Sequence, residues 1–570
     1  MPRKFTGEIF HSPKRITQKN GDIYVYDRTM RYNPHTQKSE VIESRLSGKI
    51  KAGTSEIVPT RPKKSAKTAT PSTRQHVGAM DILDFVGTDS LIDDNLLACF
   101  DEGDAQKIIS IARYLVATEG QSLTRLENWA LNHPLPYTNG ITEDIYYKLF
   151  SSLGINEKAQ QQYFQLRSQQ LNRSSLIAYD STTVSTYSAN QIEARQGFNK
   201  DRDGLDTIKV LTLYSVMDRE PIAFTKQPGN LPDVTSLANA LKQLQTLSNE
   251  KSLIVTDNGY YSQSNMAEMA KAGMHFLTAA PHSLRWIKDL IDENRARIDD
   301  IDNMCPFDRG ISGICIPVMR DLSIIRKRSR NGVQAGDKET FKRRLYVHIY
   351  FNRSNEGRDE LALREKLATL KEQLENGVSV FDEASEEKIK TFLNVSRKGR
   401  GGKIHVSFNN DAYKEAGRYY GYFALISNKE NNPFEALKKY RLREKIEEMF
   451  SILKSGLDAR RPRTWFPDNL RGRMFVQFVA LGYYCALQKR IDNVLEELGK
   501  PAPSKAKKDI DLEESLKRWL EKKSIVQILD WFDCVEQITV DTLRGKKRWS
   551  TETTNCDRLF LEKLGMKLKS

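Results

Sequence analysis

Several common classes of protein are excluded by what the sequence lacks. Its six cysteines are scattered without any Cys-x-x-Cys pair, which argues against a zinc finger and against a secreted disulfide framework. The longest apolar run, Met474–Leu487, has 14 residues and is too short to cross a bilayer. The N-terminus leads into polar sequence without the apolar core of a signal peptide. No Gly-x-x-x-x-Gly-Lys loop is present, so ATP-driven chemistry is not expected. We therefore expect a soluble protein of a reducing compartment, with no membrane partner and no nucleotide cofactor.

Charge, by contrast, is plentiful and mostly positive. Among the 570 residues, 89 Lys and Arg outnumber 74 Asp and Glu, which leaves a net charge of +15. A basic surface of this size favours polyanionic partners, with nucleic acid the leading candidate. At roughly 150 residues per domain, the length predicts about three or four domains.

The positive charge is concentrated near the N-terminus. Residues 1–78 contain 16 Lys and Arg against 6 Asp and Glu, so they carry most of the excess. Within them, Ile23–Tyr26 and Val41–Ile42 predict short strands around the turn Asn33–His35, and the Pro-, Ser- and Lys-containing stretch 59–73 predicts a flexible basic linker. We favour an arm that binds the phosphates of a nucleic-acid backbone, and a solvated tail is the alternative. The predicted DNA contacts of this arm are Arg61, Lys63 and Lys64.

Beyond the N-terminal region, the pattern of apolar residues is first helical and then alternates between strands and helices. Residues 79–172 are mostly helical by pattern, and two helices on either side of Gly154 predict a helix-turn-helix for DNA or an ordinary helical hairpin. From residue 173 the predicted elements follow the order β, β, β, α, β, α, β. That order predicts a mixed sheet covered by helices.

Two acidic residues follow short apolar runs in this mixed region. Asp180 follows Leu176–Tyr179, and Asp257 follows Leu253–Thr256. We expect both at the carboxyl ends of strands, where ligand sites of open α/β sheets collect. Taken singly, each has an ordinary structural explanation as a turn residue.

A predicted helix at residues 433–456 supplies further polar groups. At about 100° per residue, Tyr440, Arg443, Glu447 and Lys454 fall on one strip beside the apolar stripe. Arg443 and Glu447 also have the spacing of a simple i, i+4 salt bridge. Four such side chains bordering the buried face favour a cleft over an ordinary solvated surface.

These residues have the spacing of a known signature. Tyr440-x₂-Arg443-x₃-Glu447-x₆-Lys454 resembles the signature of bacterial DDE transposases of the insertion-sequence-four type. Tyr179–Thr182 and Thr256–Tyr260 resemble the first and second acidic motifs of that family, and the resemblance covers most of residues 80–490. Two positions depart from the family pattern. Asn258 stands where many members have Arg, and Lys445 stands where many have Trp.

The resemblance implies an α/β fold with an RNase H-like mixed sheet and flanking helices, interrupted by a strand-rich insertion domain. It also implies N-terminal DNA-binding and C-terminal helical regions. The implied domains are 1–78, a basic β-hairpin module and linker; 79–172, a helical DNA-binding domain; 173–281 and 433–498, the two parts of the catalytic core; 282–432, the insertion; and 499–570, a C-terminal helical region.

The resemblance also implies a chemistry. Asp180, Asp257 and Glu447 would be the catalytic residues and would bind two divalent ions, Mg²⁺ or Mn²⁺, which are hard cations that prefer oxygen ligands. The implied activity is cut-and-paste transposition on double-stranded DNA. The protein would bind the terminal inverted repeats of a mobile element, hydrolyse the phosphodiester bonds at its ends, and join the 3′-hydroxyl to target DNA. The implied setting is the bacterial cytoplasm, in association with the nucleoid.

The implied DNA contacts lie in two places. Tyr440, Arg443 and Lys454 would hold phosphates near the metal ions. Basic clusters of the insertion would line the DNA path, and their members are Arg326, Lys327, Arg328, Lys342, Arg343 and Arg344.

Partners and competing functions complete the expectations. A homodimer on paired DNA ends is expected, and the apolar helical face that runs from Leu512 to Leu529 either binds the second copy or folds into its own chain. The eight histidines are dispersed and give no catalytic signal. The alternatives are an RNase H-like nuclease without strand transfer, a non-catalytic DNA-binding protein derived from a transposase, and a basic globular protein with an accidental motif.

Overall fold

The computed structural model describes residues 9–33, 38–58, 72–171, 176–188, 190–197, 199, 203–233, 235, 237, 252–281, 283–325, 336–377, 383–397, 404–457, 459, 464–500, 507–542, 545–551 and 553–566. The chain forms two compact units. One consists of Met1–Arg74 with Gln537–Ser550, and the other of Gln75–Glu536 with Thr551–Ser570. The chain therefore passes between the units after Arg74, after Glu536 and after Ser550.

The smaller unit contains the predicted N-terminal hairpin. Strands β3 (Ile23–Asn33) and β4 (Lys38–Ile50) pair antiparallel in a five-stranded sheet. The other strands of this sheet are β1 (Ile9–His11), β2 (Lys14–Thr17) and β5 (Ile57–Val58). The strands are longer than the apolar pattern indicates because backbone pairing continues through the mostly exposed residues of β4.

A second small sheet joins distant parts of the sequence. Strands β18 (Glu536–Thr542) and β19 (Gly545–Ser550) form an antiparallel hairpin, and β18 also neighbours β6 (Ser72–His76). The C-terminal region thus contains a hairpin in addition to the helices expected there. Its period-two alternation of Ile538 and Val540 with polar neighbours is the strand signal that the helical interpretation passed over.

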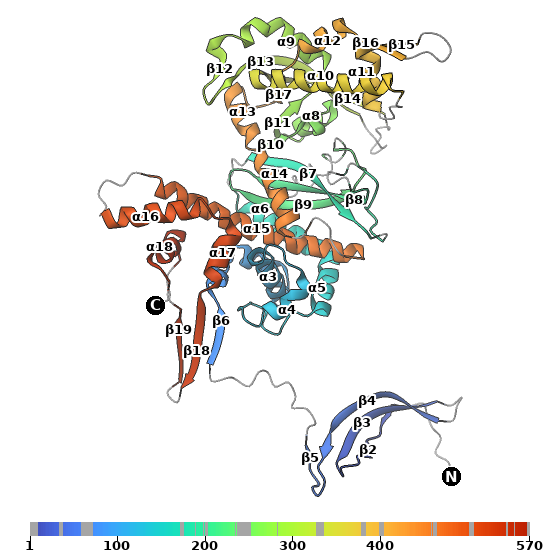
Figure 1. Ribbon diagram of the computed structural model, residues 1–570, viewed down its shortest axis with the longest axis vertical. Coiled ribbons are helices and arrows are strands. Elements are labelled where there is room, and N and C mark those ends of the chain that lie inside the picture. The colour runs from blue at the N-terminus through green and yellow to red at the C-terminus, as the bar shows by residue number, and fades with distance from the viewer. Residues whose placement is uncertain are drawn as a thin grey trace. The chain divides into compact units, whose positions relative to one another are not determined.

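The larger unit begins with a bundle of helices. They are α1 (Gly78–Asp89), α2 (Ile92–Cys99), α3 (Glu102–Ala117), the short η1 (Leu123–Arg125) and α4 (Leu126–Trp129), α5 (Glu143–Ile155) and α6 (Glu157–Gln169). The long helix α15 (Pro467–Leu498) packs against α3 and α5 on one side and against β9 on another, so it joins the bundle to the main sheet (Figure 1). Within the part of the chain that the structure describes, no helix combines the length and apolar character that a bilayer span requires.

Gly154 marks a close helix contact rather than a turn. The sequence predicts a glycine turn there, but Gly154 lies inside α5, where a Cβ atom would come within 2.0 Å of the Asp468 carbonyl oxygen of α15. At Gly472 of α15, a Cβ atom would lie 1.9 Å from the Phe150 carbonyl oxygen. The two glycines therefore let the backbones of α5 and α15 approach each other, because each removes the side chain that would keep them apart.

This contact yields a prediction about stability. We expect Gly472→Ala to lower the free energy of unfolding by about 3 kcal/mol or more, because the backbones of α5 and α15 would have to separate. Gly103→Ala on α3 is the matched control, since a Cβ atom there meets nothing within 4 Å. Alanine should stabilise that helix by about 0.5–1 kcal/mol. Urea unfolding of both variants measures the difference, and an equal effect of the two substitutions would contradict the close-contact account.

The main sheet has the strand arrangement of an RNase H-like fold. Strands β7 (Leu176–Thr186), β8 (Asp206–Ser215) and β9 (Glu220–Pro228) form an antiparallel meander. Strands β10 (Leu253–Thr256) and β11 (His275–Ala280) add to the β7 side in parallel orientation. The described elements include helix α8 (Gln263–Lys271) between β10 and β11, which confirms the predicted mixed α/β fold.

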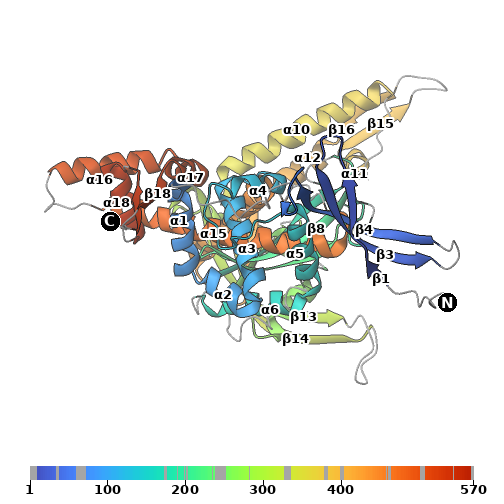
Figure 2. The same cartoon turned by 90° about the horizontal axis from the view of Figure 1, so that it is seen from below.

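Residues 282–432 extend the same sheet. Strand β17 (Tyr422–Ser427) pairs antiparallel with β11, and β14 (Lys338–Asn352), β13 (Asp308–Ile325) and β12 (Met304–Cys305) follow outward. Helix α9 (Arg285–Ile298) packs on β13 and β14. The remaining part of this segment has a small core of its own around Leu367 and Val406. Its elements, which lie together in Figure 2, are α10 (Arg353–Glu375), α11 (Glu383–Phe392), β15 (Leu393–Arg397), β16 (Ile404–Phe408) and α12 (Asn410–Gly417).

The apolar face of the C-terminal helices is used within the chain. Leu516 and Leu520 of α16 (Lys507–Leu520) are buried, as are Ile525, Ile528 and Leu529 of α17 (Ile525–Asp533). With α18 (Asn555–Leu564), these helices belong to the main apolar core. Of the two expectations for this face, folding into its own chain is confirmed, so the face is not a free surface for a second copy.

Candidate active site

Strand register brings the first two acidic residues together. Strand β10 pairs in parallel with β7, and its last residue, Thr256, lies opposite Tyr179. The next residue of β7 is Asp180, and the residue that follows the end of β10 is Asp257. Both therefore lie at the point where β10 ends.

Asp180 itself does not lie at a strand end, which corrects the sequence-based prediction. Strand β7 continues to Thr186, and Asp180 is paired with Thr212 of β8. The strand continues because β8 supplies a backbone partner along its whole length, whereas β10 stops at Thr256 and turns into the short helix η2 (Asn258–Tyr260).

The third acidic residue comes from a helix that is not continuous. The predicted helix 433–456 consists of α13 (Pro433–Arg441), α14 (Glu444–Ser451) and a π-helical turn, η4 (Ile452–Gly456). At the junction, the Arg443 N–H donates to the Tyr440 carbonyl at 3.0 Å and the Ile446 N–H donates to the Arg443 carbonyl at 2.9 Å. These i→i−3 bonds wind the chain more tightly than an α-helix and place residues three apart above one another. The guanidinium carbon of Arg443 accordingly lies 5.5 Å from the centre of the Tyr440 ring.

Arg443 contacts all three acidic residues. Its Nη1 is 3.4 Å from Oδ2 of Asp180, and its Nη2 is 3.2 Å from Oε1 of Glu447 and 3.9 Å from Oδ1 of Asp257. The structure thus brings Asp180, Asp257 and Glu447 around one guanidinium. The simple salt bridge between Arg443 and Glu447 is present too, but it is one of three contacts.

The guanidinium is buried while its partners become progressively more exposed. The Arg443 side chain is 9% exposed, against 15% for Asp180, 44% for Asp257 and 56% for Glu447. Burial disfavours the charge of Arg443, but the nearby carboxylates outweigh it and raise the pKa of Arg443 above its usual value. One positive charge faces three carboxylates, so the group retains a negative field that attracts cations.

Tyr440 fixes the orientation of one carboxylate. Its hydroxyl donates a hydrogen bond of 2.9 Å to Oδ1 of Asp257. Burial, followed by the charge of Asp257, raises the pKa of Tyr440 above its usual value. The phenol therefore stays protonated and remains a donor at neutral pH.

The donor set fits divalent metal ions with a preference for oxygen. Three carboxylates from β7, the end of β10 and α14 face one small region, and carboxylate oxygens are the ligands that Mg²⁺ and Mn²⁺ prefer.

A further charged pair beside this site was missed from the sequence. Ser181, the neighbour of Asp180, donates through Oγ to Oδ1 of Asp233 at 3.0 Å, and Lys209 Nζ donates to the same oxygen at 2.7 Å. The available signal was Lys209, a single charged residue in the apolar run of β8 and buried in the structure.

The other predicted residues fall in three groups. Lys454 lies in η4 and is half-buried. Lys342, Arg343 and Arg344 are exposed on β14. The third group lies outside the described residues, and its members are Arg61, Lys63, Lys64, Arg326, Lys327 and Arg328.

One family of known proteins matches more than half of the chain. Residues 172–481 match the model of the family described as "Transposase DDE domain". No curated protein matches the chain. Among solved structures, the chain is similar to the piggyBac transposase in a synaptic complex with hairpin DNA, at 10% sequence identity, with 86% of this chain and 83% of that chain covered and a TM-score of 0.34. A TM-score of this size means that the two chains do not superpose closely as wholes.

Proposed function

This chain belongs to the family of proteins with the transposase DDE domain, and from that premise we propose that it is a cut-and-paste transposase of the insertion-sequence-four type. It binds the terminal inverted repeats of a mobile element, cleaves the element's ends and joins the freed 3′-hydroxyl to target DNA. The observation that carries the proposal is the convergence of Asp180, Asp257 and Glu447 on one guanidinium at the end of β10.

Each residue of the site has a role in this proposal. The three carboxylates are the catalytic residues and hold two divalent ions, Mg²⁺ or Mn²⁺. When bound, such ions activate an attacking oxygen and stabilise a leaving oxygen at phosphorus. Tyr440 holds Asp257 in one orientation through its hydrogen bond. Arg443 balances the carboxylates before DNA arrives, and Lys454 and the exposed cations of β14 bind DNA phosphates.

Strand transfer separates this proposal from its rivals. The protein is incubated with Mg²⁺, a target plasmid and a labelled DNA fragment that ends in a pre-cut terminal repeat. Joining of the label to the plasmid is expected. Cleavage of uncut ends without joining would identify an RNase H-like nuclease, and binding without either reaction would identify a non-catalytic DNA-binding protein.

The basic N-terminal module is proposed to supply much of the affinity for DNA ends. Residues 1–71 contain 15 Lys and Arg against 6 Asp and Glu. We expect their deletion to weaken end binding at least tenfold and to flatten the dependence of affinity on salt, because fewer counterions are released from the phosphates. The deletion stops before Ser72 so that β6 and its partner β18 stay intact. Gel-shift titrations at several salt concentrations test this, and an unchanged affinity and slope would assign the module to solubility only.

Assembly and location complete the proposal. Two copies of the chain act on paired DNA ends in the cytoplasm, in association with the nucleoid, so that neither end is cut alone. Short inverted repeats that flank the coding region are the expected genomic counterpart.

A further inference from the structure

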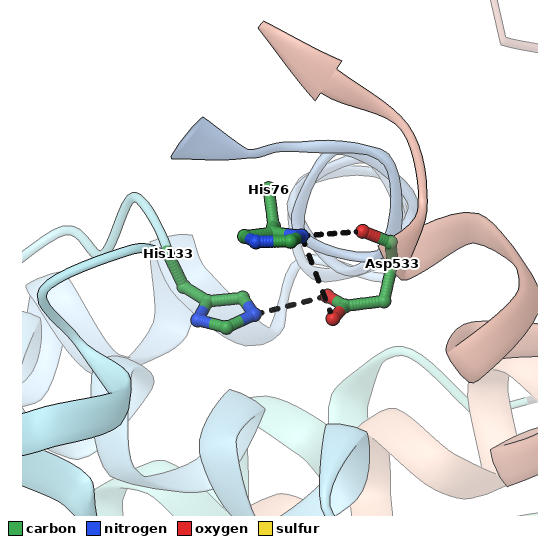
Figure 3. A group of neighbouring side chains, drawn as sticks. All are labelled: His76, His133 and Asp533. Carbon is green, nitrogen blue, oxygen red and sulfur yellow. Dashed lines mark hydrogen bonds and ion pairs between the residues drawn. The ribbon is translucent and has the colours of Figure 1, made fainter. Parts of the chain in front are cut away.

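A second group of possible metal ligands lies away from the acidic site. One ring nitrogen each from His76 and His133 and one carboxylate oxygen of Asp533 all lie within 4.8 Å of one another (Figure 3). The three residues come from the end of β6, the turn after α4 and the C-terminal end of α17. They are therefore far apart in sequence, which is why the spacing of the histidines gives no signal.

Backbone hydrogen bonds hold these segments together. The His76 N–H donates to the Asn132 carbonyl at 2.8 Å, and the Val77 N–H donates to the Val535 carbonyl at 2.9 Å. The Trp129 ring stacks on His133 with 3.7 Å between centroids and an interplanar angle of 7°. The ligand positions are thus set by the fold and by a stacked ring, before any ion is bound.

The hydrogen bonds of His133 leave its second nitrogen facing another acceptor. Nδ1 lies 2.8 Å from the Trp129 carbonyl oxygen, which can only accept, so Nδ1 carries a proton. Nε2 lies 3.0 Å from Oδ1 of Asp533. In a neutral ring, Nε2 and this carboxylate oxygen both present lone pairs. A metal ion or a single shared proton can lie between the two atoms.

His76 is oriented differently. Its Nδ1 lies 2.7 Å from the backbone carbonyl oxygen of Asp533 and 3.8 Å from Oδ2 of the same residue, and its Nε2 lies 3.9 Å from Oε1 of Glu536. Metal-ligating histidines typically donate their other ring N–H to a carbonyl or carboxylate, which fixes the tautomer and orients the ring. His133 already has that outer hydrogen bond, whereas the His76 nitrogen that contacts the carbonyl is also the one that faces Oδ2 of Asp533.

We propose that His76, His133 and Asp533 bind one structural transition-metal ion of the Zn²⁺ type, with Glu536 as the nearest further donor. Imidazole and carboxylate donors together suit Zn²⁺ and its neighbours rather than Mg²⁺. Tetrahedral Zn²⁺ with bond lengths of about 2.0–2.1 Å places its ligand atoms about 3.3 Å apart. The pair Nε2 of His133 and Oδ1 of Asp533, at 3.0 Å, is already close to that spacing, so only His76 has to approach.

The ion would act as a cross-link in the larger unit. It would join the entry to α1, the α4 turn and the end of α17, in a chain whose cysteines are unpaired among the described residues. The chain enters this unit at Gln75 and leaves it after Glu536, within a few residues of the proposed ligands. The cross-link would therefore lie beside two of the three positions in the sequence at which the chain passes from one unit to the other.

Metal content and stability of the full-length protein test the proposal. Bound metal is first removed from the protein with a chelator. Excess Mg²⁺ is then added to fill sites made of oxygen ligands alone, and the protein is titrated with Zn²⁺ or Co²⁺. We expect one equivalent that shows imidazole ligation in the Co²⁺ absorption spectrum and raises Tm. His133→Gln and Asp533→Asn should weaken this binding at least a hundredfold, and the more exposed His76→Gln should weaken it at least tenfold.

Two control variants keep the outcome interpretable. Asp530→Asn changes a carboxylate one turn earlier on α17, and His405→Gln changes an exposed histidine on β16. Both should bind Zn²⁺ as the parent protein does. The proposal is overturned if the parent binds no such equivalent, which would leave a proton between His133 and Asp533, or if all variants that keep the parent's circular dichroism spectrum bind equally.

Discussion

Glu447→Gln is expected to lower the rate of Mg²⁺-dependent cleavage of end DNA by several orders of magnitude while leaving DNA binding in place. The substitution keeps the size of the side chain but removes a negative charge from the three carboxylates proposed to hold the divalent ions. Folding should survive, because the side chain is half exposed while Ile446 and Phe450 of the same helix hold α14 in the core. Binding should survive because losing a carboxylate reduces repulsion of phosphate. A nicking assay on labelled ends, run beside a gel-shift, measures both.

Glu448→Gln is the matched control for this experiment. Glu448 is the next residue on α14, is exposed, and pairs with Lys445 at 2.9 Å on the solvent side. Such a surface pair contributes about 0–1 kcal/mol to stability, so its loss should be nearly silent for both stability and cleavage. If Glu447→Gln nicks DNA at nearly the wild-type rate while Glu448→Gln does not, the third ligand is on the other face of the helix.

Arg443→Gln is expected to destabilise the metal-free protein by about 3 kcal/mol, because it leaves three neighbouring carboxylates without their shared cation. Divalent ions should then substitute for the lost charge. Mn²⁺ should therefore raise Tm by more in the variant than in the wild-type protein. Urea unfolding in a chelator and thermal unfolding with increasing Mn²⁺ measure the two effects.

Arg441→Gln separates this effect from the general loss of an arginine. Arg441 lies at the end of α13 and pairs with Asp308 at 2.6 Å, with both side chains about one third exposed. Its substitution should cost about 1 kcal/mol or less and should not change the response to Mn²⁺. Equal behaviour of the two variants would show that Arg443 is an ordinary salt-bridge residue.

Apolar patterning predicted the order of the core elements but not the full length of its strands. In β7 the apolar run stops before Asp180, yet Thr182, Ser185 and Thr186 are buried in the strand that continues beyond it. Small polar side chains can be buried in a sheet when their groups find partners there, so hydrophobicity alone does not record them. The helix 433–456 was predicted as one piece for a related reason, because its apolar stripe persists across the tight junction at Arg443.

The contacts of the acidic site could be predicted from the sequence only between residues that lie a few positions apart on the same element. Arg443 and Glu447 are four residues apart, so their spacing predicted the salt bridge that is seen, but not the hydrogen bond of Tyr440 to Asp257. Asp233 and Lys209 meet only through the folding of a strand against a following segment, and no local pattern connects them. The same is true of His76, His133 and Asp533, whose proximity depends on three separate elements.

Because the main sheet pairs strands that lie far apart in the sequence, it can be completed only late in the synthesis of the chain. Strand β11 ends at Ala280, but its neighbour β17 begins only at Tyr422, about 140 residues later. At about 5–20 residues per second, the ribosome needs about 7–30 s to deliver that neighbour, and α14 follows it. During this interval the nascent core has two of its three acidic residues and an unpaired edge strand, which is an aggregation hazard. Chains truncated between residues 281 and 421 should therefore depend on chaperones, and they would lack the third residue of the acidic site.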